Sequence, residues 1–344
     1  MAPRLSVVVP IYNVESYLQE CLDSIAAQTF DDFECVMVDD GSTDGSAAMA
    51  EAYAAADPRF RLVRQENQGL GAARNTGWRN AAADAEYLTF VDSDDIVPAD
   101  AYERMIASLD KSGSDFAAGN VLRLVADELI PSRVHLEPFR NELQATHVTQ
   151  LPTLVRDRTA WNKVYRRSFF DGAGLLYPEG MLYEDAPVSI PLHFAANSVD
   201  VFSEPVYHWR IRESGGTLSI TQKRTDPQGL VDRVRSIELV RGWLAARPEP
   251  ENETYLRAYD ANTLREEIPM FFAWVSRGDR PFRLAYQQHV SRLLQEMGPD
   301  RLESLSGPLR LKYRLTLENH IGTLVLLQRV QQRYWALRRM LTRG

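Results

Sequence analysis

Two aspartates separated by one residue could do the most definite chemistry in this sequence. Asp92 and Asp94 follow residues 87–91, a run of five strand-forming residues, and Asp95 adds a third carboxylate. Like charges crowded at a strand end favour a bound cation, and Mg²⁺ or Mn²⁺ takes such oxygen ligands together with phosphate and water. The alternative is a polar loop that caps the following helix. Open α/β sheets bind ligands at the carboxyl ends of their strands, which favours the metal site.

A second acidic pair, Asp39 and Asp40, ends the apolar run 33–38. This is a crevice position suited to hydrogen bonding a base or a ribose. The residues that follow, 41–46, are rich in Gly, Ser and Asp. A purely structural turn built on Asx side chains is therefore the alternative.

Gly69 and Gly71 precede Arg74 at the start of an expected helix. The glycines allow a ligand to approach the backbone closely. A guanidinium beside a helix N-terminus suits a phosphate or a ribose-phosphate group. The alternative is a surface arginine after a flexible lead-in.

Glu184 and Asp185 form the third acidic pair. A positioned carboxylate can remove a proton from an attacking hydroxyl group and contributes about 10²–10⁴ in rate. The alternative is an acidic first turn of the helix expected at 186–196, stabilised by the helix dipole.

An alternation of strands and helices must position these groups. Apolar, β-branched runs predict strands, and residues recurring at helical spacing predict helices between them. Asn13 is expected to cap the first helix. This order predicts a parallel sheet with helices on both faces, built from strands at 5–10, 33–38, 60–64 and 87–91 and helices at 14–25, 46–56 and 70–82.

Two other classes of nucleotide-binding protein share this order of elements. Dinucleotide-binding dehydrogenases carry Gly-x-Gly-x-x-Gly after the first strand. Sugar nucleotidyltransferases place a glycine-rich, basic loop at the same point. Here the first strand ends in residues 10–13, Pro-Ile-Tyr-Asn, which contain no glycine. Both classes are therefore disfavoured.

The sequence resembles the glycosyltransferase family 2 enzymes, which have the nucleotide-diphospho-sugar-binding GT-A fold. The resemblance covers roughly residues 4–222. Four matching segments occur in order within the first 95 residues, and further matches follow. The segments are 6–13, 38–44, 67–75 and 92–95, then 161–165, 183–185, 207–212 and the pair Ser219–Ile220.

The resemblance implies a metal-dependent inverting transfer of a sugar from a nucleotide-diphosphate donor, with UDP the first choice. It makes Asp185 the general base, with Glu184 a supporting or acceptor-binding group. Mg²⁺ or Mn²⁺ would be held at Asp94, with Asp92 and His208 as further ligands, although His208 as a packed strand residue is the alternative. Donor binding is expected from Pro10, Tyr12, Asp39, Asp40, Arg74, Asp92, Arg210, Arg212 and Ser219.

Two further features concern the acceptor and closure of the site. Trp161 could stack on a sugar face and Lys163 could contact an anionic group, with core packing the alternative for Trp161. Residues 213–217, rich in Ser and Gly, have the composition of a closing lid. Expected acceptors are a cell-surface glycan, a polyol-phosphate polymer or a lipid-linked sugar. A small diffusible metabolite, or a non-catalytic glycan- or nucleotide-binding homologue, remains the alternative.

Composition and length set the domain organisation. The 344 residues, 44% hydrophobic and 25% charged, are those of a globular protein. We expect a GT-A domain over 1–222, with a nucleotide-binding half at about 1–100 and an acceptor half at about 101–222. A helical cap or assembly region is expected over 223–344. Cys21 and Cys35 lie in apolar segments and predict buried thiols and a cytoplasmic protein.

The charge is distributed unevenly along the chain. The net charge is −8, yet residues 310–344 contain eight basic residues and one acid, so this tail carries +7 and the preceding residues −15. The acidic body argues against binding nucleic acid. Apolar residues from 309 to 341 mark a basic amphipathic segment. Such a segment could lie on the inner face of the cell membrane, or pack on the body or on another subunit of a homo-oligomer.

Overall fold

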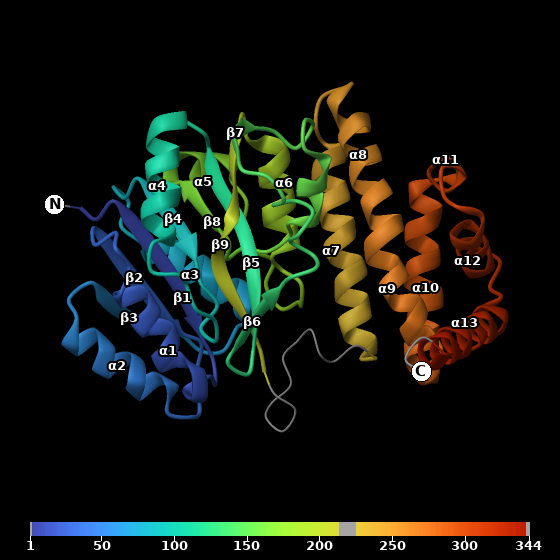
Figure 1. Cartoon of the computed structure of the whole chain (residues 1–344), viewed down its shortest axis with the longest axis horizontal. Helices are drawn as coiled ribbons and strands as arrows, with labels where there is room; N and C mark the ends of the chain where they lie inside the picture. Colours follow the sequence, from blue (N-terminus) through green and yellow to red (C-terminus); the bar gives the residue numbers. More distant parts are fainter. Residues whose placement is uncertain (1, 213–224, 342–344) are drawn as a thin grey trace. The chain divides into compact units, whose positions relative to one another are not determined.

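The computed structural model describes residues 2–212 and 225–341 (Figure 1). The chain divides into two compact units, Met1–Gly216 and Thr217–Gly344. The first contains a mixed sheet with helices, and the second is helical. A mostly parallel α/β sheet followed by a helical region is confirmed.

The first half of the sheet is wholly parallel. Strands run in the order β3-β2-β1-β4, and α1, α2 and α3 follow β1, β2 and β3 along the chain. The expected alternation is confirmed. Its elements are β1 (Leu5–Ile11), α1 (Glu15–Ala26), β2 (Phe33–Asp39), α2 (Ser46–Ala56), β3 (Phe60–Arg64), α3 (Leu70–Asn80) and β4 (Tyr87–Phe90).

The second half of the sheet departs from the parallel pattern. The order continues β4-β8-β5-β9-β7, and β8 is antiparallel to both β4 and β5. Only β9 runs parallel to β5. The added elements are α4 (Ala101–Ser112), β5 (Phe116–Val125), β6 (Glu128–Pro131), β7 (Leu143–Thr146), β8 (Lys163–Arg166), α5 (Arg167–Ala173), α6 (Ala186–Ala195) and β9 (Val199–Ile211).

Register brings the acidic motifs to one edge of the sheet. Ile11 at the end of β1 pairs with Asp39 at the end of β2. The Val91 amide, directly after β4, donates to the Val8 carbonyl of β1 at 2.9 Å. Because the carboxyl ends of these parallel strands meet, Asp39 at the end of β2 and Asp92 after β4 lie on the same edge of the sheet, on either side of β1.

Packing on both faces of the sheet fixes that edge. Alternate residues of β1, from Leu5 to Ile11, are buried in one apolar cluster with residues of α1 and α4. On the other face, a Cβ placed on Gly77 of α3 would lie 2.2 Å from Val8 Cγ1. Glycine is therefore needed where α3 crosses β1. Cys21 and Cys35 are buried free thiols.

The prediction that Asn13 caps α1 is wrong. Asn13 has a φ of 50°, and its side-chain oxygen accepts from the Thr43 amide at 2.8 Å instead. The start of α1 is held by the turn before α2, where Ser46 Oγ accepts from Val14 N at 2.9 Å. Glu15 returns a bond by accepting from Gly45 N at 2.9 Å. The two helix starts thus cap each other.

The second unit consists of helices around buried aromatic and aliphatic side chains. Tyr259, Phe272, Tyr286 and Leu293 are among its buried residues. Asp226 and Asp279 cap α7 and α10 through side-chain bonds to backbone amides. The helices are α7 (Pro227–Ala245), α8 (Glu251–Asn262), α9 (Ile268–Val275), α10 (Arg280–Met297), α11 (Pro299–Glu303), α12 (Gly307–Leu317) and α13 (Ile321–Leu341), with a π-helical turn at Thr263–Glu267.

The basic tail is not one continuous helix with one apolar stripe. The chain breaks between α12 and α13, where Asn319 has a φ of 58°. Among the apolar residues of this tail, Leu315 and Leu324 are buried, whereas Leu311, Leu327, Val330 and Tyr334 are exposed. No helix in the described part of the chain is both long and apolar enough to span a bilayer.

Candidate active site

Arg74 of α3 joins two of the predicted acidic motifs. Its Nη2 lies 2.7 Å from Asp92 Oδ1, and its Nη1 lies 2.5 Å from Glu184 Oε1. The arginine is 2% exposed, and its guanidinium lies 5.3 Å from the Tyr177 ring centroid. Asp92 and Glu184, which lie 18 and 110 positions from Arg74 in the sequence, therefore share one buried cation. This cation binds carboxylates here, whereas the sequence predicted a donor phosphate as its partner.

Close packing on α3 brings the Glu184 segment into place. Asn75 exchanges two hydrogen bonds with the Tyr177 backbone, each 2.9 Å long. A Cβ on Gly71 would lie 2.3 Å from the Pro178 carbonyl oxygen. The glycine predicted to admit a ligand is therefore needed for contact with the protein's own backbone.

Asp39, the last residue of β2, and Asp40, the next residue, have different roles. Asp40 accepts from the Gln68 and Gly69 amides, both at 2.9 Å, and from Gln65 Nε2 at 2.7 Å. These bonds shape the loop before α3, where Gly69 has a φ of 87°. Asp39 accepts from the Ser42 amide through one oxygen, at 3.1 Å, and its other oxygen accepts no bond from the described residues. Of the pair, Asp39 is the better placed to recognise a base.

The predicted base pocket also includes Pro10 and Tyr12. Pro10 is buried within β1, where it pairs with Val38. Tyr12 follows the same strand, and its side chain is 49% exposed. An exposed aromatic ring one residue beyond a strand end, near Asp39, is available for stacking on a planar group.

The predicted phosphate-binding arginines, Arg210 of β9 and Arg212 just after it, lie against the Asp94–Asp95 segment. Arg212 Nε is 2.8 Å from Asp94 Oδ2. Arg210 donates from its backbone amide to Asp95 Oδ1 at 2.7 Å and from Nε to the Asp94 carbonyl at 2.8 Å. Burial raises the pKa of the Asp94 carboxyl, and the Arg212 charge opposes that rise. The arginines are thus beside the expected phosphate position but already bind acidic residues.

The predicted metal ligands are only partly brought together. His208 exchanges two backbone bonds with Ile96, at 2.9 and 3.2 Å, next to the acidic segment. Burial lowers the pKa of its imidazole, which favours the neutral form that a ligand needs. Within residues 2–212 and 225–341, however, no three His, Cys, Asp or Glu side chains form a metal-holding group. The Asp92 and Asp94 carboxylates fit a hard cation by their chemistry, but no complete protein cage surrounds them.

Glu184 and Asp185 stand at the start of α6. Asp185 is half-buried and accepts from the Ala186 amide at 2.8 Å through its side chain. Glu184 is 4% exposed. Burial and the adjacent Asp185 charge raise the pKa of Glu184 to about 7, against the attraction of Arg74. Arg74 also pairs with Asp92, so its guanidinium is shared between two carboxylates.

This shift predicts a pH-dependent stability. The folded chain holds the Glu184 proton more tightly than the unfolded chain, whose ordinary value is 4.5. The contribution of Glu184 to stability is therefore fully present below about pH 4.5 and is lost as pH rises through about 7. As pH rises from about 4.5 to about 7, we expect the Tm of the wild-type chain to fall relative to that of Glu184→Gln. Parallel Tm profiles would contradict the shift, and Glu128→Gln, at an exposed site, is the control.

The predicted acceptor residues Trp161 and Lys163 are core residues. Lys163 is 1% exposed, and its ammonium lies 2.7 Å from Asp157 Oδ2 and 2.8 Å from Asn162 Oδ1. Trp161 is buried and stacks on Tyr207, with ring centroids 4.2 Å apart. Neither side chain offers surface to an acceptor, so the structure argues against the predicted acceptor-binding role of both residues.

Two residues of the site were not singled out from the sequence. Tyr207 accepts from the Asp92 amide at 3.0 Å and is buried. Asn75 also holds the geometry described above. Both lie inside motifs that the sequence did reveal, but nothing local distinguished them from their neighbours. Ser219 and the expected lid at 213–217 lie outside the described residues.

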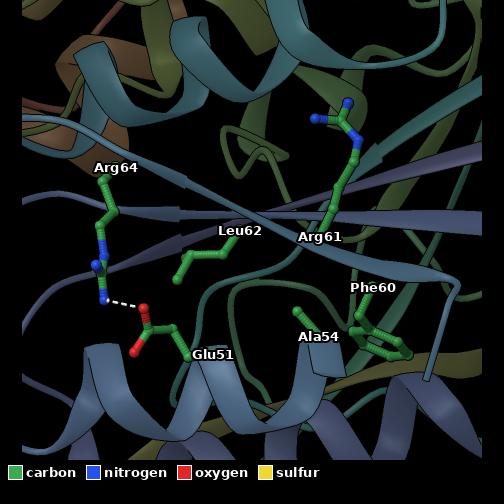
Figure 2. A pocket seen from close by; sticks show the side chains of 6 residues that line it. All are labelled: Glu51, Ala54, Phe60, Arg61, Leu62 and Arg64. Carbon is green, nitrogen blue, oxygen red and sulfur yellow. Dashed lines mark ion pairs between the residues drawn. The ribbon is translucent and has the colours of Figure 1, made fainter. Parts of the chain in front are cut away.

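A surface hollow elsewhere in the first unit lacks this chemistry. It has a volume of about 420 Å³ and lies between α2 and β3. Figure 2 shows the ion pair between Arg64 and Glu51, 2.8 Å long, among its lining residues. None of the predicted site residues lines it, so the candidate site remains at the Asp92–Arg74–Glu184 contact.

Comparison with known proteins identifies the class that this fold and site define. Residues 6–173 match the model of glycosyl transferase family 2, and the chain belongs to that family. The resemblance seen in the sequence is confirmed.

Individual relatives support the same assignment. The chain is 36% identical over 233 residues to EpsH of Bacillus subtilis (strain 168), which is named a glycosyltransferase; the match covers 66% of each chain. It is 27% identical over 241 residues to TarS of Staphylococcus aureus, named a poly(ribitol-phosphate) beta-N-acetylglucosaminyltransferase, over 69% of this chain. The matched regions span only 66% of EpsH and 40% of TarS.

Solved structures share the fold. TarS 1–349 in complex with UDP-GlcNAc matches with a TM-score of 0.77 at 19% identity, covering 96% of this chain and 92% of that one. The mannosyltransferase PcManGT from Pyrobaculum calidifontis, in complex with GDP-Man and Mn²⁺, matches with a TM-score of 0.50 at 18% identity. That match covers 96% of this chain and 87% of PcManGT.

Proposed function

We propose that this chain transfers a sugar, with inversion, from a UDP-sugar to a hydroxyl group of a cell-surface polymer, glycan or lipid-linked acceptor. The observation that carries the proposal is the Arg74 bridge between Asp92 and Glu184. It joins the acid motif expected at the donor phosphates to the acid pair expected at the acceptor. A transferase needs both within one site.

The residues suggest a single displacement. Asp185 accepts the proton of the acceptor hydroxyl as that oxygen forms a bond to the anomeric carbon. The bond between that carbon and the diphosphate oxygen breaks at the same time, and UDP leaves with the bonding electrons. Glu184, held by Arg74, orients this edge of the site beside Asp185.

Mg²⁺ or Mn²⁺, when bound, would neutralise the diphosphate leaving group. Asp94 and Asp92 are the carboxylates that would hold it, with His208 adjacent on β9. Arg212 now pairs with Asp94, so this ion pair must open or rearrange to free the carboxylate. A freed Arg212 would remain beside the donor phosphates, where a guanidinium binds well.

Relatives give the donor and acceptor classes their support. TarS binds UDP-GlcNAc and is named for a poly(ribitol-phosphate) acceptor, and PcManGT binds GDP-Man with Mn²⁺. We therefore favour UDP as the nucleotide and a polyol-phosphate or related surface polymer as the acceptor.

A donor screen tests the function directly. The purified chain is offered UDP-, GDP-, TDP- and CDP-sugars, and binding and nucleotide release are measured. We expect a UDP-sugar to bind most tightly and to release UDP when acceptor polymer is added. Release with a soluble sugar alone would favour a small-metabolite enzyme. Binding without any metal-dependent release would favour a non-catalytic homologue.

The metal role gives a separate prediction. EDTA should abolish turnover, and Mg²⁺ or Mn²⁺ should restore it. Asp94→Asn should weaken Mn²⁺-dependent UDP binding, measured by calorimetry, while the protein remains folded. Asp100→Asn is a matched control because Asp100 also pairs with an arginine, Arg104, at 3.0 Å but lies outside the site. Full turnover after exhaustive dialysis against EDTA would rule out the metal.

A further inference from the structure

Helix α13 has an apolar face that the second unit does not cover. Its inner face carries Leu324, Val325 and Gln328, which are 0%, 8% and 4% exposed. On the same side, Gln332 Nε2 donates to the Ala273 carbonyl of α9 at 3.3 Å. The helix is therefore anchored to its own unit along one side.

The opposite side presents Leu326, Leu327, Val330 and Tyr334. They are 62%, 37%, 58% and 58% exposed. Leu326, Val330 and Tyr334 recur every four residues, so they form one stripe along the helix. We call these four residues the outer stripe. Large apolar side chains gathered on one exposed helix face mark an interaction surface.

Arginines border the outer stripe on both flanks. At about 100° per residue, Arg329 and Arg333 fall on one flank and Arg338 on the other. All three are exposed, and α13 contains no acidic residue. In the neighbouring α12, Arg310 and Arg314 are also exposed. The only acid from 310 onward, Glu318, pairs with Arg314 at 2.7 Å.

We propose that the outer stripe of α13 docks on an anionic lipid bilayer. Apolar side chains between basic flanks are the pattern of a helix that lies in a membrane interface. Tyr334, within the outer stripe, is an aromatic type enriched at that depth. The arginines would contact acidic headgroups while the outer stripe enters the acyl boundary.

Charge favours a bilayer over a second copy of this chain. An isologous dimer through this face would bring the same arginine-bordered surface against itself. Like charges across an interface oppose association, and no acid on α13 relieves them. An acidic leaflet instead neutralises all three flanking arginines. This inference does not depend on the proposed sugar transfer.

Vesicle flotation of the full chain tests the proposal. We expect binding to phosphatidylcholine vesicles that contain phosphatidylglycerol, weakened by added salt, and little binding to phosphatidylcholine alone. The double variant Val330→Glu with Tyr334→Glu should lose about tenfold or more of the partition coefficient, because charges enter the buried face. The single control Leu284→Glu changes a side chain that is 59% exposed on α10 and should bind normally.

Two double variants that remove the same charge distinguish a specific role of the basic flank from a general electrostatic effect. Arg329→Gln with Arg333→Gln should weaken vesicle binding, whereas Arg235→Gln with Arg265→Gln should not, although both remove the same charge from exposed sites. Circular dichroism confirms that each variant is folded. Absence of flotation by the wild-type chain would overturn the proposal. The proposal would also be overturned if the chain formed a dimer that Val330→Glu dissociates while vesicle binding stays unchanged. That result would assign the outer stripe to contact with a second copy of the chain.

Discussion

We expect Asp185→Asn to lower kcat by about 10²–10⁴ while the Kd for the donor changes little. The amide is nearly isosteric with the carboxylate but cannot accept the acceptor's proton. Asparagine is also a good helix N-cap, so the bond to the Ala186 amide and the start of α6 should survive. The measurement is kcat against donor binding by calorimetry, with Tm as a check on folding.

The matched control for this variant is Asp279→Asn. Asp279 also caps a helix, accepting from the Phe282 amide at 2.9 Å, but belongs to the second unit. It should leave kcat unchanged. If Asp185→Asn kept near-normal turnover, the base would have to be another group. Glu184→Gln would then be the next variant to assay, because Glu184 is the adjacent carboxyl and its pKa is raised to about 7.

We expect Arg74→Met to cost about 3–5 kcal/mol of stability, the usual result of removing one partner from a buried ion pair. Asp92 and Glu184 would lose their shared counter-charge, and Glu184 is almost fully buried. Turnover should fall as well, since the bridge between the two halves of the site is gone. Denaturant unfolding measures the loss of stability, and kcat measures the loss of turnover.

Two further variants distinguish the effect of losing the Arg74 bridge from the effect of losing any positive charge. Arg79→Met removes an exposed arginine from the same helix and should change stability by less than about 0.5 kcal/mol. Adding Glu184→Gln to Arg74→Met should recover part of the lost stability, because one uncompensated carboxylate is removed. If the double variant were no more stable than Arg74→Met, repulsion and desolvation of the two acids would not explain the loss.

The structure also changes how the motif from Asn67 to Asn75 is understood. Its Gly71 packs against the Pro178 carbonyl, its arginine binds the Glu184 carboxylate, and its final asparagine binds the Tyr177 backbone. Asp40 holds the loop that leads into it. These contacts fix the geometry of the candidate site within the chain itself, and such preorganisation would lower the cost of positioning the proposed catalytic groups.

The sequence by itself determined the order of the elements and where the acids fall along them. Strand and helix patterns depend on residues within one element, so β1 to β4 and α1 to α3 were predictable. Asp39 and Asp92 lie at strand ends in sequence, and parallel pairing of both strands with β1 places them on one edge of the sheet. The family motifs depend on the same local order.

Tertiary structure alone decided which charged and aromatic groups are available. Lys163 looks like a ligand-binding cation until Asp157 is placed 2.7 Å away in the core, and Trp161 is covered by Tyr207. Arg74 contacts Glu184, which lies 110 positions away in the sequence. Burial and ion pairing are properties of contacts between distant segments, and a polar group's partners set whether it is free to bind a ligand. No local pattern carries that information.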